Sequence, residues 1–401
     1  MKRENGFTLI ELMVSMAILV AVVGVVVGAL LQAQHATQGV AYEANTQENL
    51  RAGMHFMVQD LLQAGEGIPQ GGISVPYDAA GNSAIVRPGV FPPTGPDFPN
   101  PVGNGFTLMP AISPGSQIGQ DATTVDPVTG AVLNGNLQTD VINILYADNS
   151  LQDAAGHYLY SFPVVQAVGP PACAGTIDPV GASVLLDVGC FVMPGVTQPI
   201  TVGNLIMFHN SNGTALEYVT GVAGQTILFG GGDPAGLNAT GQPNGTVAQL
   251  QNAGGGFPPT VITRVWMVTY YIDSTTTPTD PQLIRQVNYP NYPAPGIAAA
   301  NPPAAIADNI ENLSYSYDIT GSNYPGLGVY PLGPGNVPTP QLPDTPAQIR
   351  AVNVFLAGRS ELPYQASTSP QFLRNNLSTQ VSVRSLSFKD VFTTAASATA
   401  P

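Results

Sequence analysis

The sequence predicts an α+β protein, in which one long N-terminal helix precedes a large β-rich globular head with long Pro- and Gly-rich loops. Three observations support this fold class. Residues 12–31 form an apolar run whose only polar side chain is Ser15, and residues 34–66 continue with helical periodicity. The remaining sequence combines short β-branched runs with many of the 44 Gly and 38 Pro residues. Because Pro lacks a backbone donor and Gly weakens helices and strands, this composition is typical of loop-rich β structure.

The apolar run is long enough to cross a membrane. A helix of about twenty residues spans the hydrocarbon core of a bilayer, which is about 30 Å thick. Lys2 and Arg3 precede the run, so the short N-terminus is expected to stay cytoplasmic while the rest of the chain crosses. Residues 7–33 are therefore the predicted transmembrane segment of a single-pass protein of the inner membrane.

Glu11 separates the possible interpretations of this N-terminus. A secretory signal peptide would have a shorter apolar region closed by a small-x-small cleavage site, which this run lacks. A plain signal anchor fits the length of the run. Neither explains a carboxylate at the membrane entrance, where an ionisable group costs free energy unless it has a partner.

The stretch Gly6-Phe7-Thr8-Leu9-Ile10-Glu11 resembles the class III signal of type IV prepilins. The resemblance implies that residues 1–6 are a leader peptide. It further implies that prepilin peptidase cuts between Gly6 and Phe7 on the cytoplasmic side and N-methylates Phe7. Glu11 would then neutralise the N-terminal amine of a neighbouring subunit during assembly. A local role for the same carboxylate is compatible with this one, because Thr8-x-x-Glu11 fits a capping box at a helix start.

The sequence departs from many major pilins in the apolar helix, where Gly24 and Gly28 stand in the region that often holds a proline. Each glycine weakens a helix by about 1 kcal/mol relative to alanine in water. Two interpretations remain open: the glycines mark a segment that melts in a filament, or they permit close contact between helices.

The helix is predicted to run from about Phe7 to Ala64, with residues 34–66 as its amphipathic continuation. Its end is indicated by Gly65, Gly67 and Pro69. The apolar residues of the second half share one face. They are Leu50, Met54, Met57, Val58, Leu61 and Leu62. The polar residues fall largely elsewhere: Gln47, Glu48, Arg51, Gln59, Asp60 and Gln63.

Residues 67–401 are the predicted head domain. Residues 68–137 read as loops with a few short strands. The pair Asn212-Gly213 indicates a tight hairpin. Later strands are predicted from β-branched and aromatic runs. They are Asp140–Tyr146, Leu205–Phe208, Leu216–Val219, Thr226–Phe229, Val261–Ile272, Gln282–Val287, Ile310–Tyr317, Ile349–Leu356 and Thr379–Phe388.

Several segments of the body resemble the PilW family of minor pilins and, more distantly, the J-type minor pseudopilins of type II secretion. They occur in the expected order and cover about a quarter of the chain. They are Asn49-Leu50-Arg51 with residues 59–65, Tyr270-Tyr271-Ile272-Asp273 with Leu283-Ile284-Arg285, Ile310-Glu311-Asn312-Leu313 with Tyr315 and Tyr317, and Ile349-Arg350-Ala351-Val352 with Arg359-Ser360.

Charge and cysteine content limit the possible partners. The net charge is −14, so no nucleic-acid partner is expected.

If the head is exported, Cys173 and Cys190 are expected to form a disulfide, and the alternative is two buried thiols. No residue constellation of an enzyme, metal site or cofactor site is recognised, so neither catalysis nor a cofactor is expected.

Together these features predict a minor pilin of a type IV pilus, assembled through its N-terminal helix in a priming or tip complex. Its expected partners are prepilin peptidase, other pilins and the inner membrane. The head is expected in the periplasm and later in a surface filament. Two alternatives stay open: a minor pseudopilin of a type II secretion system, and an adhesive tip pilin in which exposed aromatic side chains such as Tyr289, Tyr292, Tyr315 and Tyr317 bind a surface. Packing on strand faces is the favoured role of those tyrosines.

Overall fold

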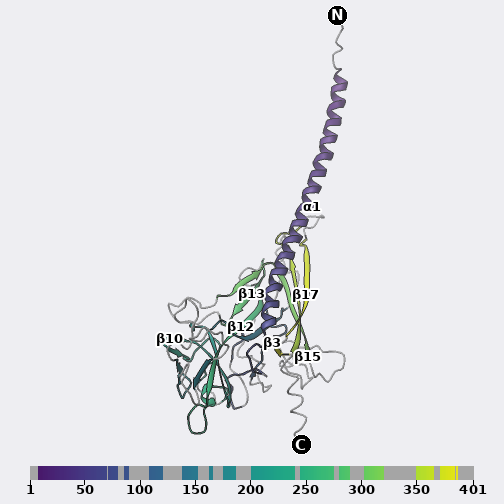
Figure 1. The fold of residues 1–401 in the computed structure, drawn as a ribbon. Coiled ribbons are helices and arrows are strands. Elements are labelled where there is room, and N and C mark those ends of the chain that lie inside the picture. Colours follow the sequence, from purple (N-terminus) through teal and green to yellow (C-terminus); the bar gives the residue numbers. More distant parts are fainter. Residues whose placement is uncertain are drawn as a thin grey trace.

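The structure is a computed structural model of the 401-residue chain. It describes residues 8–69, 71–79, 85–89, 108–120, 138–151, 162–165, 175–186, 200–239, 244–274, 280–289, 302–319, 349–364, 371–383 and 385–386. One long helix projects from a β-rich head (Figure 1). The predicted α+β class is confirmed.

Helix α1 spans Leu9–Gln63, which corresponds to about 80 Å if the helix is straight. Its start lies close to the predicted one, because Thr8 has extended backbone angles and acts as the N-cap. Its end follows the predicted glycine signal. Gly65 and Gly67 adopt φ values of +80° and +68°, a conformation that a residue without Cβ adopts at little cost.

The largest sheet has eight strands and is organised around β12 (Thr260–Asp273). The second half of β12 pairs with β4 and β13, whereas its first half pairs with β8 and β5. All of these pairings are antiparallel. The other strands of this sheet are β3 (Ile112–Gly115), β4 (Val141–Ala147), β5 (Phe162–Val165), β8 (Leu205–Asn210), β9 (Gly213–Tyr218), β13 (Gln282–Val287) and β14 (Ala304–Ala307).

A second sheet has three antiparallel strands in the order β15 (Ile310–Ile319), β16 (Ile349–Arg359) and β17 (Arg374–Ser382). Smaller elements complete the described head. They are β1 (Ile73–Ser74), β2 (Leu108–Met109), β6 (Thr176–Ile177), β7 (Ser183–Leu185), β10 (Gly221–Ala223), β11 (Thr226–Leu228) and the 3₁₀ helix η1 (Val247–Leu250).

Most predicted strands are confirmed within a few residues, and the last is misplaced. The prediction put it at Thr379–Phe388, whereas β17 begins at Arg374 and ends at Ser382. Its register on β16 explains the shift, because Leu377 pairs with Leu356 and Asn375 with Gly358. These earlier, polar-rich residues are held by the ladder rather than by an apolar pattern of their own.

The predicted hairpin between β8 and β9 is present, with its turn one residue earlier than the Asn-Gly pair. Asn210 pairs with Gly213, so Ser211 and Asn212 form the two-residue loop. The Asn212 side chain donates to the backbone carbonyl oxygens of Leu250 and Gln251, each at 3.1 Å. The loop is therefore fastened to the end of η1.

The main core forms where α1 passes between the two sheets (Figure 1). Leu50, Met57 and Leu61 on α1 are almost completely buried there. Burying a side chain of this size stabilises the fold by about 1.5–3 kcal/mol. The sheets contribute apolar side chains that face the helix: Ile142, Ile144, Val268, Ile272, Leu283, Leu313, Val352, Val354, Leu356 and Val381.

At Gly53, α1 approaches both sheets closely. A Cβ at this position would lie 2.8 Å from Leu283 Cδ2 on β13 and 3.4 Å from Leu356 Cδ2 on β16. It would also lie 3.3 Å from Ala307 Cβ on β14. The glycine therefore lets the helix sit in the seam between the eight-stranded and three-stranded sheets.

Candidate assembly site

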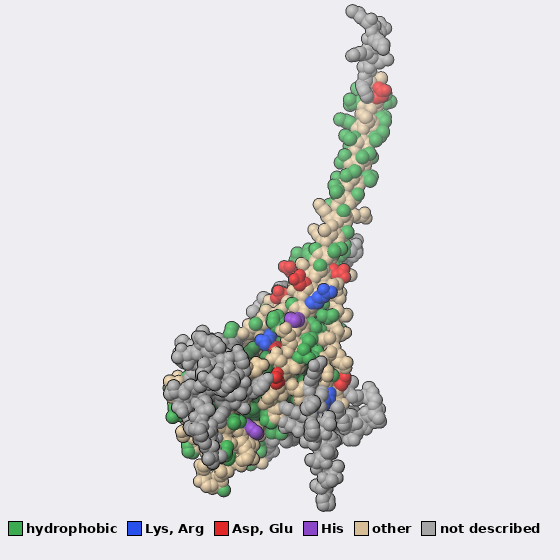
Figure 2. All heavy atoms as spheres, viewed as in Figure 1, with side chains coloured by type: hydrophobic (Ala, Val, Ile, Leu, Met, Phe, Trp, Pro, Cys, Tyr) green, Lys and Arg blue, Asp and Glu red, His purple; other side chains and the backbone are tan. Residues whose placement is uncertain are grey.

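The segment of α1 that leaves the head, residues 9–38, is here called the free segment. All of its residues are exposed, and Leu9, Val20 and Val25 are each more than 70 % exposed. Apolar side chains line the outer part of this segment on the face that Figure 2 shows. The helix is long enough and apolar enough to cross a membrane. Such a surface suits lipid or other apolar helices rather than water.

Gly24 and Gly28 lie within the free segment. A Cβ at either position would meet nothing within 4 Å, and both residues remain helical. The two glycines are one turn apart and therefore share a face of the helix. The structure thus keeps room at these positions for a helix that approaches closely.

Glu11 and Thr8 form a complete capping box at the start of α1. The Thr8 backbone N–H donates to Glu11 Oε2 at 3.0 Å, and the Thr8 hydroxyl donates to the same oxygen at 2.9 Å. In return, the Glu11 backbone N–H donates to Thr8 Oγ1 at 3.4 Å. The local capping role predicted for Glu11 is confirmed. The carboxylate remains fully exposed, so its outer side is open to a further partner.

The head holds the other end of α1 through a buried charge. Asp60 accepts hydrogen bonds from Arg285 Nε at 2.8 Å and from Arg285 Nη2 at 3.0 Å. The hydroxyls of Tyr270 and Tyr146 also donate to the Asp60 carboxylate, that of Tyr146 at 3.3 Å. Three strands, β4, β12 and β13, therefore bind one side chain of the helix.

The sheet register brings these donors together. Tyr270 on β12 is directly opposite Arg285 on β13. Tyr146 on β4 is opposite Trp266, which lies on the same face of β12 as Tyr270 because successive side chains alternate. All of them therefore face α1.

Burial raises the pKa of Tyr270 and of Tyr146, and the Asp60 charge adds to both rises. Both phenols therefore stay protonated as donors. Burial alone would lower the pKa of Arg285, but its hydrogen bonds and charge attraction to Asp60 outweigh that effect and raise it. Arg285 consequently stays protonated. Its side chain is 25 % exposed, and that of Asp60 is 6 % exposed.

Two residues of α1 differ from the prediction. Asp60 was expected with the polar residues away from the apolar face, but it is buried, because Arg285 and the two tyrosines compensate its charge. Leu62 was expected on the buried face, but its side chain is 48 % exposed. Because successive residues point in directions about 100° apart around a helix, the side chain of Leu62 points away from the sheets when that of Leu61 faces them. The sequence did contain a signal for the burial of Asp60. It lies three residues after Met57 and four before Ala64, a spacing that places it on the same face of the helix as these buried residues.

The structure describes only some of the residues predicted for processing, for a disulfide and for surface binding. Gly6, Phe7, Cys173, Cys190 and Tyr292 lie outside the described residues. Tyr315 and Tyr317 are stacked with ring centroids 6.4 Å apart, and Tyr289 is buried and donates to the Val86 carbonyl at 2.6 Å. Packing, the favoured role for these tyrosines, is confirmed, and surface binding by the head stays a prediction.

Comparison with known proteins adds one finding about the N-terminus. No curated protein and no solved structure gives a significant match to the chain. The family described as the prokaryotic N-terminal methylation motif matches residues 1–27. This range contains the Gly6–Glu11 signal and most of the exposed apolar run, and the motif implies processing by prepilin peptidase and assembly with pilins. The match and the exposed helix together support a type IV pilin-like protein.

Proposed function

We propose that this protein is a minor pilin of a type IV pilus, of the PilW type. Prepilin peptidase cuts it between Gly6 and Phe7 and N-methylates Phe7. One observation carries the proposal: an apolar helix leaves the head fully exposed and begins with the methylation motif. A solvent-exposed apolar surface of this extent requires lipid or other helices to cover it.

The proposed action is mechanical rather than catalytic. The subunit waits in the inner membrane, anchored by residues 12–31, with its head in the periplasm. On extraction, Glu11 pairs with the methylated amine of a neighbouring subunit, which offsets the cost of placing both charges in an apolar bundle. The Asp60–Arg285 pair then transmits the pull on the helix to the head.

A minor rather than a major role is supported by size and charge. The head extends over more than 300 residues, and the chain carries a net charge of −14. Copies with this charge repel each other when they are packed side by side. A few copies placed among other subunits, in a priming or tip complex, avoid that repulsion.

The test is to coexpress the full chain with a prepilin peptidase and to measure its intact mass and N-terminal sequence. The expected product begins at N-methylated Phe7. The matched control is Gly6→Ala, which keeps the helix unchanged but should block the cut. A wild-type chain that still begins at Met1, or one cut beyond Leu31, would contradict the proposal.

A minor pseudopilin of a type II secretion system is the second candidate, because it would use the same exposed helix and processing signal. The two roles separate in a deletion strain of the native host. Loss of surface pili with normal secretion of exoproteins supports the pilus role. Loss of secretion with normal pili supports the pseudopilin role. An adhesive role of the head would be tested by surface binding of the piliated strain.

A further inference from the structure

The two edges of the three-stranded sheet differ. One edge is the outer side of β15, where Asp140 binds two residues of the strand. The Asp140 backbone N–H donates to the Leu313 carbonyl at 2.9 Å, and the Asp140 carboxylate accepts from the Tyr315 backbone N–H at 2.8 Å. The other edge is the outer side of β17, which pairs with β16 alone among the described strands. The sheet is therefore capped on one side only.

The register of β17 shows which of its backbone groups face outward. Its flanking residues Leu373 and Val383 bond toward β16, since Ser360 N–H donates to the Leu373 carbonyl and Val383 N–H donates to the Arg350 carbonyl, each at 2.8 Å. Bonded residues alternate along an antiparallel ladder, so the backbone groups of even-numbered residues point away from β16. The open edge, as it is called here, consists of the backbone N–H and carbonyl groups of Ser378, Gln380 and Ser382.

The open edge is accessible. The side chains of its three residues are exposed, and no described group bonds to their backbone N–H or carbonyl groups. Asn376, the preceding even-numbered residue, differs, because its N–H donates to Asn375 Oδ1 at 2.8 Å. The open edge therefore presents a row of donors and acceptors that matches the backbone of another extended strand.

The centre of β17 lacks the features that usually protect an exposed edge, which are a proline, a bulge, a charge or a very short strand. It spans nine residues without proline, and its ladder with β16 has no register shift, whereas the ladder of β15 has two. Its one charged residue, Arg374, lies at its start and donates to Glu311 at 2.7 Å. An edge in this form suits pairing with another chain.

The open edge runs along α1. Before β17, Tyr364 lies against the helix at Gly39, where a Cβ would be 3.0 Å from its ring. After β17, Leu386 lies against the helix at Gly65, where a Cβ would be 2.9 Å from its Cδ2. The strand therefore follows α1 in the same direction (Figure 1).

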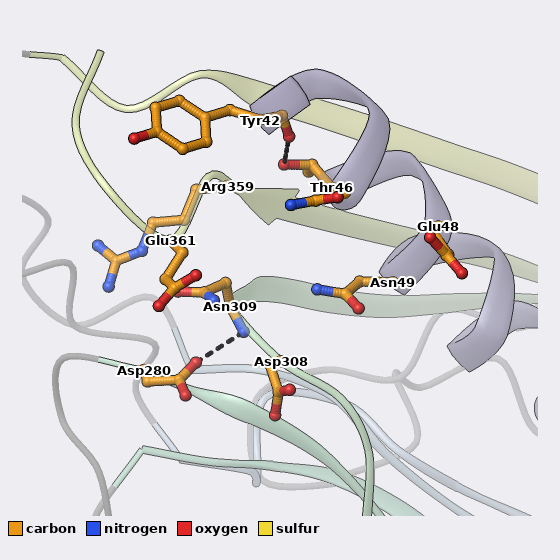
Figure 3. A pocket seen from close by; sticks show the side chains of 10 residues that line it. Tyr42, Thr46, Glu48, Asn49, Asp280, Asp308, Asn309, Arg359 and Glu361 are labelled. Carbon is orange, nitrogen blue, oxygen red and sulfur yellow. Dashed lines mark hydrogen bonds between the residues drawn. The ribbon is translucent and has the colours of Figure 1, made fainter. Parts of the chain in front are cut away.

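The hairpin of β16 and β17 meets α1 where the free segment ends. Gly39 is the first residue after that segment. Arg359, the last residue of β16, shares a polar pocket with Tyr42 and Thr46 of the helix (Figure 3). The open edge is therefore continuous with the helix surface through which pilin-like subunits assemble.

The two faces of β17 set the chemistry of a strand added to it. Leu377 and Thr379, which alternate with the open-edge residues, are partly buried, and Leu377 packs against the main core. The side chains of Ser378 and Gln380 lie on the opposite face of the sheet. An added strand would continue this alternation, with apolar side chains beside Leu377 and uncharged polar ones beside Ser378 and Gln380.

A second copy of this chain fits the open edge less well. Antiparallel pairing of two β17 strands relates the copies by a twofold axis. Because β17 follows α1, the two helices would then point in opposite directions, which two subunits anchored in one membrane do not allow. The net charge of −14 on each copy adds repulsion. A different subunit is free of both constraints.

We propose that the open edge of β17 binds an extended segment of a different pilin subunit, which adds a fourth strand to the three-stranded sheet. The proposal rests on the proposed pilin function for the identity of the partner. Main-chain hydrogen bonds supply the attachment, and the alternation of apolar and polar side chains selects the segment. The added strand holds the neighbour beside α1, at a site separate from Glu11.

The first test identifies what lies against the open edge. The photoreactive residue p-benzoylphenylalanine replaces Ser378 in the full chain, and sheared filaments from the native host are irradiated. We expect a cross-link that mass spectrometry assigns to a different pilin. The matched control carries the same residue at Val180, which is 60 % exposed outside this sheet, and should give at least a fivefold lower yield. A cross-link to a second copy, a cross-link within one chain, or a yield at the control level would overturn the proposal.

The second test removes one donor of the open edge. Ser378→Pro deletes an outward N–H, whereas Ser378→Val changes the side chain and keeps the N–H. Proline is tolerated on an edge strand where the N–H faces solvent. We expect at least fivefold less of the subunit in sheared filaments for Ser378→Pro than for Ser378→Val, and equal incorporation would overturn the proposal. If the proline also lowers the urea midpoint followed through Trp266, the cross-link from position 378 decides.

Processing at Gly6–Phe7 separates failure of the open edge from failure of the proposed function. Every variant should be cut and N-methylated like the wild type, because position 378 lies in the head and the signal lies at the N-terminus. Normal processing with a control level of cross-linking would overturn the open edge alone. An uncut wild type would overturn the pilin proposal, and irradiation of isolated membranes would still show whether the open edge holds another chain.

Discussion

Arg285 on β13 binds Asp60 on α1 through two hydrogen bonds, of 2.8 Å and 3.0 Å, across 225 positions of sequence. The fork of the guanidinium matches the two carboxylate oxygens, which fixes the rotation of the helix as well as its position. The apolar side chains of Met57 and Leu61, which lie near Asp60 on the same helix, are fully buried. They exclude water, but they have little directional preference. The charged pair therefore specifies the register of α1 on the head.

Asp60→Ala should destabilise the head by about 3 kcal/mol, because it leaves the Arg285 guanidinium without its partner in a largely buried site. The measurement is urea unfolding of the full chain in detergent, followed through Trp266, the only tryptophan. Trp266 lies opposite Tyr146, so its emission reports on the strands that hold the helix.

The matched control for that substitution is Arg374→Gln. Arg374 donates to Glu311 at 2.7 Å, but its side chain is 48 % exposed, so the loss should stay below about 1 kcal/mol. Similar losses for the two variants would show that the Asp60 pair contributes no more than a surface ion pair, and would contradict the assigned role in register.

Gly53→Val should destabilise the head by about 1–3 kcal/mol, because the added atoms meet Leu283 and Leu356 from two different sheets. Gly53→Ala should change stability by less than about 1 kcal/mol, since its helix propensity offsets the tighter contact. Gly24→Val is the control, because a Cβ there meets nothing within 4 Å. Urea unfolding that is unaffected by Gly53→Val would mean that α1 shifts freely in the seam.

Glu217→Gln should stabilise the protein more as the pH rises. Burial raises the pKa of Glu217 well above its ordinary value, and the charge of Asp233 adds to the rise, although a hydrogen bond from the Val247 backbone opposes it. A raised folded-state pKa gives stability that is present at low pH and is lost as the pH rises through that pKa. Glutamine keeps an oxygen acceptor for the Val247 N–H but does not ionise.

The measurement is the unfolding free energy of both proteins between about pH 5 and about pH 9. The difference between the variant and the wild type should grow with pH. A constant difference across this range would show that Glu217 does not change its ionisation with folding in the way that its burial implies.

The elements that sequence reasoning placed well carry a strong local pattern. Gln282–Val287 was predicted with the bounds that β13 has, and α1 starts and ends within two residues of its prediction. Both have uninterrupted periodicity and clear end signals. The pattern of β17 is weaker in sequence, because two of its partly buried positions are the polar residues Asn375 and Thr379. Its ladder with β16 comes from distant residues, which a local window does not contain.

The candidate site divides in the same way. The Thr8–Glu11 capping box follows from spacing alone and is present in the structure. The Asp60 cluster depends on a register that places Tyr270 opposite Arg285, and on the seam in which Gly53 lets α1 approach both sheets. Those relationships are set by packing over more than 200 positions, so composition and motif could not predict them.

Substitutions at Thr8 and Glu11 distinguish the two roles assigned to the helix start. Thr8→Val removes the hydroxyl that accepts from the Glu11 N–H and should cost only the cap, about 1 kcal/mol of local helix stability. Glu11→Gln keeps the side-chain size but removes the charge that would pair with a neighbouring amine. Incorporation into sheared filaments should fall at least roughly tenfold for Glu11→Gln, equivalent to about 1.4 kcal/mol, and less than about twofold for Thr8→Val.

Ser15→Ala is the control for a polar change inside the apolar run, because its hydroxyl only donates to the Leu12 carbonyl of the same helix at 2.9 Å. Processing at Gly6–Phe7 is measured by intact mass in every variant, so that a defect in assembly is not confused with a defect in cleavage. Equal loss of incorporation for Thr8→Val and Glu11→Gln would mean that helix capping accounts for the glutamate. Loss confined to Glu11→Gln requires a partner outside the helix, because within the helix the Thr8 hydroxyl and backbone N–H are the groups that meet its carboxylate.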